Sequence, residues 1–283
     1  MKSVTTSVTI MRIALFSLLA LLSAAAWVGS GESASVQGAD ATPVLVELFT
    51  SEGCSSCPPA DRLLQKLDAQ PLPGAQMIVL SEHVDYWNHI GWKDPYSDHS
   101  YSERQSAYAR RFALGSVYTP QMVVDGSTEF TGSDSGLADK AVAKELGAPR
   151  IPVRLSSIST DASNILHAHI EVGALASTFG SPQAEVYVAI ALNRAESQVS
   201  SGENAGHRLA HVAVVRSFTK IGVLKQGQGL AQDVRLKLDP GSDPRNLRLI
   251  AFVQEPRQGR VLGAAAMLVD TANATRTAKF VQK

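Results

Sequence analysis

The first half of the chain alternates short apolar runs with segments of helical apolar spacing. Short runs bounded by turn residues predict strands at 44–49, 76–81, 121–124 and 128–131. Apolar positions three or four residues apart predict helices at 60–67, 100–114 and 137–146. The order β-α-β-α-β-β-α predicts parallel crossovers followed by an antiparallel hairpin.

After residue 149 the pattern changes to alternating or short apolar runs separated by turn residues. These runs lie at 153–158, 165–172, 186–192, 209–218, 234–238, 247–253 and 261–267. Several short strands without a convincing helix predict an immunoglobulin-like β-sandwich. The expected fold class is therefore α/β plus all-β, with domains at 43–149 and 150–283.

The N-terminal segment has the pattern of a secretory signal. Lys2 and Arg12 precede an apolar run at 13–22, and three alanines follow at 24–26. This predicts a signal peptide over 1–26 and a leader over 27–42, with an uncleaved anchor as the alternative. No later run is long enough to span a bilayer, so we expect a periplasmic or secreted protein without a transmembrane span.

Composition narrows the function classes further. The 283 residues contain 26 Lys+Arg and 26 Asp+Glu, and 45% are hydrophobic. The apolar share can build packed cores, and the absence of a basic excess argues against a nucleic-acid partner. The chain has two cysteines, which excludes a disulfide-stapled miniprotein and a four-thiolate metal site.

Those two cysteines form the motif Cys54-Ser55-Ser56-Cys57, between a predicted strand and a predicted helix. A helix N-terminus stabilises a thiolate, so we expect Cys54 to be the exposed attacking thiolate and Cys57 the resolving thiol. Two alternatives stay open. The pair could form a structural disulfide, or it could bind copper or zinc together with the imidazole of His83.

The segment after the second strand is rich in aromatic residues. Trp87 and Trp92 lie in this loop, and such rings suit a surface that contacts a substrate peptide. The alternative is that they merely pin a long loop. Glu52, close to the first cysteine, is either a proton acceptor or a solvated carboxylate.

A Cys-x-x-Cys-Pro motif at a helix start, followed by Thr119-Pro120 at a strand start, resembles the thioredoxin fold. In that family the matching proline is cis and faces the redox pair. The resemblance therefore implies a cis Pro120 against Cys54 and Cys57. It also implies that the backbone of Thr119 is open to a substrate strand.

A wider set of motifs resembles a bacterial family of secreted proteins, the domain of unknown function 1223, with a thioredoxin-like part. The motifs are FTSEGCSSCPPAD, EHVDYW, GWKDP, YTPQM and SGENAGH. This resemblance implies a fold and a compartment but no established reaction. The leading hypothesis is thiol–disulfide exchange with a protein or small-molecule thiol or disulfide, without a cofactor. The alternatives are a non-catalytic envelope binding protein and a copper-handling protein.

Overall fold

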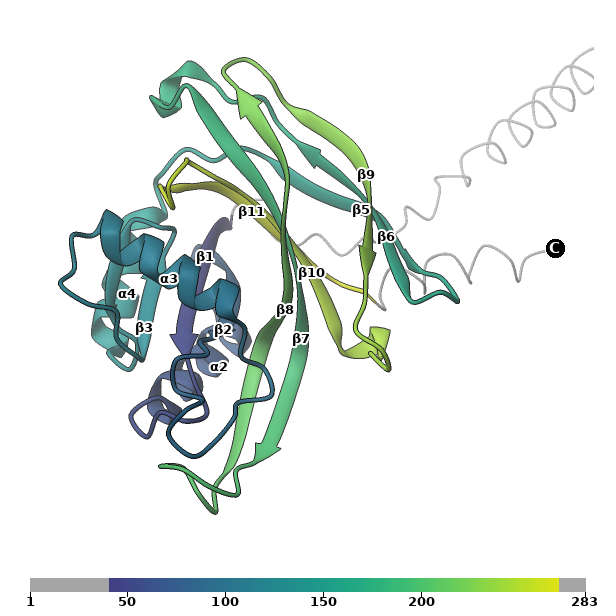
Figure 1. Cartoon of the computed structure of the whole chain (residues 1–283). Coiled ribbons are helices and arrows are strands. Elements are labelled where there is room, and N and C mark those ends of the chain that lie inside the picture. Colours follow the sequence, from purple (N-terminus) through teal and green to yellow (C-terminus); the bar gives the residue numbers. More distant parts are fainter. Residues whose placement is uncertain (1–40, 270–283) are drawn as a thin grey trace, which may run out of the picture. The chain divides into compact units, whose positions relative to one another are not determined.

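The computed structural model describes residues 41–269 (Figure 1). The predicted signal peptide lies outside the described residues, as do most of the predicted leader and the end of the predicted second domain. Within residues 41–269, no helix is both long and apolar enough to cross a membrane.

The first part of the described chain contains four strands and three helices at the positions that the apolar pattern predicts. They are β1 (Thr42–Thr50), α2 (Pro58–Ala69), β2 (Ala75–His83), α3 (His99–Arg111), β3 (Gln121–Val124), β4 (Thr128–Thr131) and α4 (Ser135–Glu145). Strand β1 pairs in parallel with β2 and antiparallel with β3. Strands β3 and β4 form a hairpin around Asp125 and Gly126, both in left-handed conformations.

The rest of the described chain is almost entirely strand. Its elements are β5 (Val153–Thr160), β6 (Ile165–Val172), η1 (Ser177–Phe179), β7 (Gln183–Gln198), β8 (Arg208–Lys225), β9 (Leu230–Lys237), η2 (Pro244–Asn246), β10 (Leu247–Gln254) and β11 (Val261–Leu268). The polar segment after Leu192 continues β7 well beyond its predicted end, because it pairs with the start of β8.

The fold class predicted from the sequence is wrong. The described chain is mostly β, and an eight-stranded mixed sheet runs in the order β11-β10-β7-β8-β2-β1-β3-β4 (Figure 1). The remaining strands form a three-stranded sheet, β5-β6-β9. A thioredoxin-like domain followed by an immunoglobulin-like sandwich does not describe this arrangement.

The predicted fold class is wrong because one edge of β2 pairs with a strand from the second half of the chain. Strand β2 pairs in parallel with β8 through Ser81 and Val214, so strands from the second half of the chain extend the first sheet. Alternation along a strand predicts which residues face a core, but it carries no information about which edge the strand joins.

Strand β1 lies inside this sheet and is buried on both faces. Val44, Val46 and Leu48 pack into the core formed with α2 and α4, whereas Leu45 and Phe49 belong to cores on the opposite face. Burial on both faces explains why β1 reads as a continuous apolar run. It also fixes the end of β1, from which the Cys-x-x-Cys segment leaves the sheet.

Candidate functional site

Cys54 and Cys57 lie between the end of β1 and the start of α2, and a disulfide joins them. Cys57 is the N-cap of α2, and its carbonyl accepts hydrogen bonds from the amides of Ala60 and Asp61 at 2.8 and 3.1 Å. Prolines occupy the next two positions, where a helix needs no amide donor. The local sequence therefore places the pair at a helix N-terminus, where the dipole favours a thiolate.

The expectation that Cys54 is exposed is wrong, since both cysteines have 0% exposure. The turn between β7 and β8, residues 199–207, covers them; we call it the hairpin tip. In this tip, Nδ2 of Asn204 donates to the carbonyls of Glu52 and Cys54 at 2.8 and 3.0 Å. Oε2 of Glu203 accepts from the amide of Ser55 at 3.0 Å.

The hairpin tip also contacts the aromatic loop. Oγ of Ser201 donates to the carbonyl of Gly91 at 2.6 Å. Gly202 has φ +77°, and a Cβ there would lie 3.1 Å from Cβ of Trp92. A larger residue would meet both backbone strain and a close neighbour, so glycine permits this approach of the tip.

The Thr119–Pro120 bond precedes β3 and is cis, which confirms the prediction for that bond. Pro120 is buried, and its carbonyl accepts from the amide of Gly132 at 2.9 Å. A Cβ on Gly132 would lie 3.2 Å from Cβ of Ala60 and 3.3 Å from Cβ of Pro120, which places the proline near the first turn of α2. Contact between Pro120 and the two sulfurs stays a prediction.

Trp87 and Trp92, the two tryptophans of the aromatic loop, each donate a hydrogen bond to a residue in or near one of the two motifs. Nε1 of Trp87 donates to Oγ1 of Thr119 at 2.8 Å. Nε1 of Trp92 donates to Oε2 of Glu52 at 2.8 Å. Both rings are therefore tied to residues next to the Cys–Cys or Thr–Pro motif, and both are half-buried.

His83, the predicted third metal ligand, is buried and paired with a carboxylate. Its Nδ1 lies 2.7 Å from Oδ2 of Asp94, which also accepts from the amide of Glu52 at 2.8 Å. Burial raises the pKa of Asp94, but the charge and hydrogen bond of His83 outweigh it, so the pKa is lowered overall. Within the described residues, no group of three or more His, Cys, Asp or Glu side chains is arranged to hold a metal ion.

A second buried histidine, His211 on β8, lies between two carboxylates. Its Nε2 is 3.3 Å from Oε1 of Glu52, and its Nδ1 is 3.7 Å from Oδ1 of Asp61. Asp61 also accepts from Oγ1 of Thr50 at 3.0 Å. We call Glu52, Asp61 and His211 the Glu52–His211 cluster. Its two carboxylates flank the Cys pair in sequence. Glu52 precedes Cys54 by two residues, and Asp61 follows Cys57 by one helical turn.

His211 is charged at neutral pH. Burial lowers its pKa, but the nearby carboxylates of Asp61 and Glu52 outweigh this effect and raise the pKa to about 10. The contacts of 3.3 and 3.7 Å are long, and neither ring nitrogen makes a well-formed hydrogen bond within the described residues. The imidazolium can donate a proton and a carboxylate oxygen can accept one, which is the chemistry that a dithiol needs when it forms a disulfide.

Sequence reasoning missed His211, Asn204 and Glu203 as site residues. All three belong to the β7–β8 hairpin, which approaches the Cys pair only because β8 pairs with β2. The glycines at 202 and 206 did signal a tight turn, but nothing local indicates what that turn contacts.

Comparisons with known proteins agree with this fold. A family model described as "Protein of unknown function (DUF1223)" matches residues 45–254. No curated protein matches the chain in sequence.

Two solved structures are similar over most of the chain. Protein AGR_C_4864 from Agrobacterium tumefaciens is 27% identical, with a TM-score of 0.63, over 82% of this chain and 96% of that one. HBP35 of Porphyromonas gingivalis is 17% identical, with a TM-score of 0.61, over 83% of this chain and 78% of that one. The first similarity extends across both parts of the chain, and the second shows the fold alone.

Proposed function

Because the chain belongs to the DUF1223 family, whose description assigns no function, we propose a function from the site itself: a thiol–disulfide oxidoreductase acting through Cys54 and Cys57. The observation that carries the proposal is the Glu52–His211 cluster beside a Cys pair at a helix N-terminus. A buried imidazolium between two carboxylates, close in sequence to both cysteines, is typical of sites where protons are transferred.

The proposed reaction transfers two electrons from the reduced pair to a disulfide substrate. The Cys54 thiolate attacks one sulfur of the substrate, a Cys54–substrate bond forms, and the other substrate sulfur leaves as a thiolate. The Cys57 thiol then loses its proton and attacks Sγ of Cys54. This step forms the Cys54–Cys57 disulfide and releases the second substrate thiolate.

Two features of this chain support those roles. The N-terminus of α2, a helix of 12 residues, favours the thiolate form of the attacking cysteine. Asp61, one turn after Cys57 on the same helix, is the nearest carboxylate in sequence and serves as proton acceptor for the Cys57 thiol. Before the transfer, the His211 imidazolium offsets part of the negative charge of Asp61 and Glu52; once Asp61 holds the thiol proton, Glu52 is the carboxylate that His211 still faces.

Access to the sulfurs requires movement of the hairpin tip, because neither cysteine is exposed. Two hydrogen bonds from Asn204 and one to Glu203 hold the tip over the pair. Each of the two bonds from Asn204 joins neutral groups and contributes about 0.5–1.5 kcal/mol net, which is small enough for thermal opening. We propose that a substrate reaches Cys54 in the open state, passing between the tip and the loop that carries Trp87 and Trp92.

A periplasmic or secreted location belongs to the same proposal. The pattern of the first 26 residues is that of an exported protein, and an oxidising compartment favours the disulfide form, so each further cycle needs a thiol reductant that returns the pair to the dithiol. The substrate class that fits this setting is a protein or small-molecule thiol or disulfide.

One observation favours a second candidate, an envelope binding protein with a structural disulfide. Both sulfurs are fully covered, as inert structural cysteines commonly are. This candidate predicts that strong dithiols fail to reduce the pair in the folded protein.

The experiment that separates the two candidates is turnover of glutathione disulfide and insulin by the reduced protein. We expect wild type to turn over, Cys54→Ser to be inactive, and Cys57→Ser to accumulate a mixed disulfide on Cys54 that mass spectrometry detects. Equal rates for wild type and Cys54→Ser would refute the proposed reaction.

A further inference from the structure

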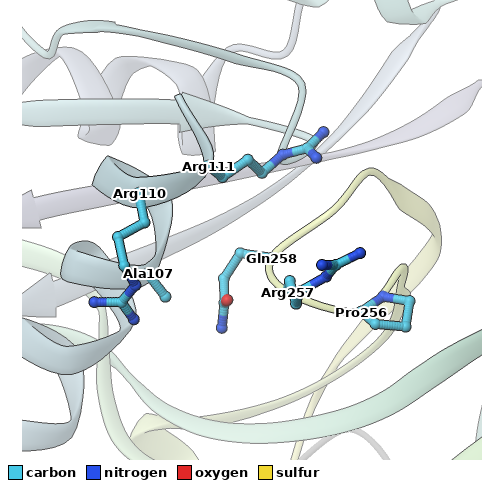
Figure 2. Close-up of a pocket in the computed structure, with 6 residues that line it drawn as sticks. All are labelled: Ala107, Arg110, Arg111, Pro256, Arg257 and Gln258. Atoms are coloured by element: carbon cyan, nitrogen blue, oxygen red, sulfur yellow. The ribbon is translucent and has the colours of Figure 1, made fainter. Parts of the chain in front are cut away.

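A pocket of about 510 Å³ lies between the last turns of α3 and the turn that joins β10 to β11. Figure 2 shows arginines of α3 on one side and the β10–β11 turn on the other. We call it the arginine pocket, and its lining residues are Ala107, Arg110, Arg111, Pro256, Arg257 and Gln258. Its volume is in the range of about 300–1,000 Å³ that is typical of small-molecule sites.

Positive charge gathers in this pocket without a counter-charge. Half of the lining residues are arginines, and none is acidic. Across the described part of the chain, no ion pair within 4.0 Å joins a carboxylate to Arg110, Arg111 or Arg257, which are all exposed; other exposed arginines are also unpaired, but these three line one pocket. In a chain with equal numbers of acidic and basic residues, three unpaired arginines around one pocket need an explanation.

The helix dipole explains part of this arrangement but not all of it. Arg110 and Arg111 lie in the last turn of α3, where cations stabilise the helix. Arg257 is not on a helix. It lies in the β10–β11 turn with a left-handed backbone, so the helix dipole does not account for a cation at this position.

Backbone geometry and hydrogen bonds fix the β10–β11 turn against α3. Arg257 and Gln258 adopt left-handed backbone conformations, with φ +58° and +52°. Such conformations are unfavourable outside glycine, and they persist where the surroundings fix them. Here Nε2 of Gln254 donates to the carbonyl of Gly259 at 2.9 Å and to Oη of Tyr108 on α3 at 2.8 Å, which ties the turn to the helix.

Arg111 is also oriented. Its Nε donates to the carbonyl of Gly126 at 3.2 Å, and its guanidinium lies 5.8 Å from the ring centre of Phe112. Its terminal nitrogens make no ion pair within the described residues and are free to donate to a ligand. An oriented guanidinium loses less entropy when it binds an oxyanion.

We propose that the arginine pocket binds a small anion that carries at least two phosphate or carboxylate groups. A guanidinium donates two parallel hydrogen bonds to either group, so several arginines around one small pocket match a ligand with several such groups. A half-open pocket of about 510 Å³ suits a small molecule, and Gln258 adds an uncharged donor and acceptor beside the arginines.

The test is isothermal titration calorimetry on the oxidised full-length protein, with inorganic pyrophosphate and citrate as separate probes. We expect one site for at least one probe, with a Kd that rises at higher ionic strength. Arg110→Gln combined with Arg257→Gln should raise that Kd about tenfold or more. Arg257→Lys should fall between the two, because it keeps the charge and loses the planar fork. The probe that binds more tightly identifies phosphate or carboxylate as the preferred group.

Two controls decide the outcome. Arg154→Gln removes an exposed arginine of β5 and should leave the Kd unchanged, and thermal unfolding should show that every variant is folded. Cys54→Ser should bind the anion as wild type does, so a failure of this inference and a failure of the redox proposal are separable. Absence of binding by wild type at millimolar probe, or an equal loss in Arg154→Gln, would overturn the proposal.

Discussion

Two buried charged clusters lie near the end of β1, one at Glu47 within the strand and one at Glu52 just after it, and they differ in the cation that each contains. In the first, Glu47 accepts from Nε of Arg104 at 2.6 Å and from Oη of Tyr108 at 2.5 Å, and Gln254 bonds to both partners. We call these four residues the Glu47–Arg104 cluster. The second is the Glu52–His211 cluster, which lies beside the Cys pair and has longer contacts.

We infer that the Glu47–Arg104 cluster has a structural role and the Glu52–His211 cluster a chemical one. Burial lowers the pKa of Arg104, but the carboxylate of Glu47 outweighs this effect, so the pKa is raised and the charge is permanent. His211 is a cation that can lose its proton near pH 10, and its two carboxylate partners flank the Cys pair in sequence. Unsatisfied buried oxygens occur in both places, because Glu82 beside Arg104 has two. The tightly bonded cluster holds the sheet to α3, whereas the loosely bonded one can take part in proton transfer.

The largest expected effect comes from breaking the Glu47–Arg104 cluster. Arg104→Met leaves the Glu47 carboxylate buried without its cation, so the free energy of unfolding should fall by about 3–5 kcal/mol. Denaturant unfolding measures this change, and Arg154→Met, at an exposed position, is the control. A loss below about 1 kcal/mol, the range of exposed ion pairs, would show that the cluster is not a structural anchor.

A smaller effect, on rate, is expected in the other cluster. Asp61→Asn removes the proposed acceptor of the Cys57 proton, and loss of a general base costs about 100-fold or more in rate. Release of the mixed disulfide, followed by stopped-flow fluorescence, measures this step. Asp68→Asn is a matched control, since Asp68 lies on the same helix but pairs with Arg248. Equal rates for the two variants would remove Asp61 from the mechanism.

The third prediction concerns pH. The folded-state pKa of His211, about 10, lies above its unfolded value near 6.5, so its contribution to stability is complete below pH 6.5 and is lost as pH rises toward 10. Within that window the free energy of unfolding should fall by up to about 1.4 kcal/mol per pH unit. His211→Gln should abolish this slope in urea unfolding series at several pH values. A slope that persists in the variant would assign the titration to another group.

These contrasts also show what the sequence alone could predict. The strand at 44–49, the helix start after Cys57 and the Thr119-Pro120 turn were predictable, because apolar runs, prolines and glycines act locally. The parallel contact between Ser81 and Val214 was not, since edge pairing leaves no local pattern. Everything that depends on that contact was missed with it, namely the fold class, His211 in the site and the covering of Cys54 by Asn204.

The smallest expected effect concerns the hairpin tip. Asn204→Ala removes the two hydrogen bonds to the carbonyls of Glu52 and Cys54, so the tip should open more often. At about 0.5–1.5 kcal/mol for each bond, reduction of the disulfide by dithiothreitol should accelerate roughly tenfold. Asn193→Ala, on β7 and away from the pair, is the control. An unchanged rate in Asn204→Ala would mean that the tip does not limit access.

The most direct test of the redox role is the reduction potential of the Cys54–Cys57 pair, measured in glutathione buffers of graded composition at pH 7. An exchange-active pair should reach equilibrium with glutathione at a potential above about −300 mV, and thiol labelling should follow that equilibrium. A pair that stays oxidised below about −300 mV, even in Asn204→Ala, would contradict the redox role and leave a structural disulfide.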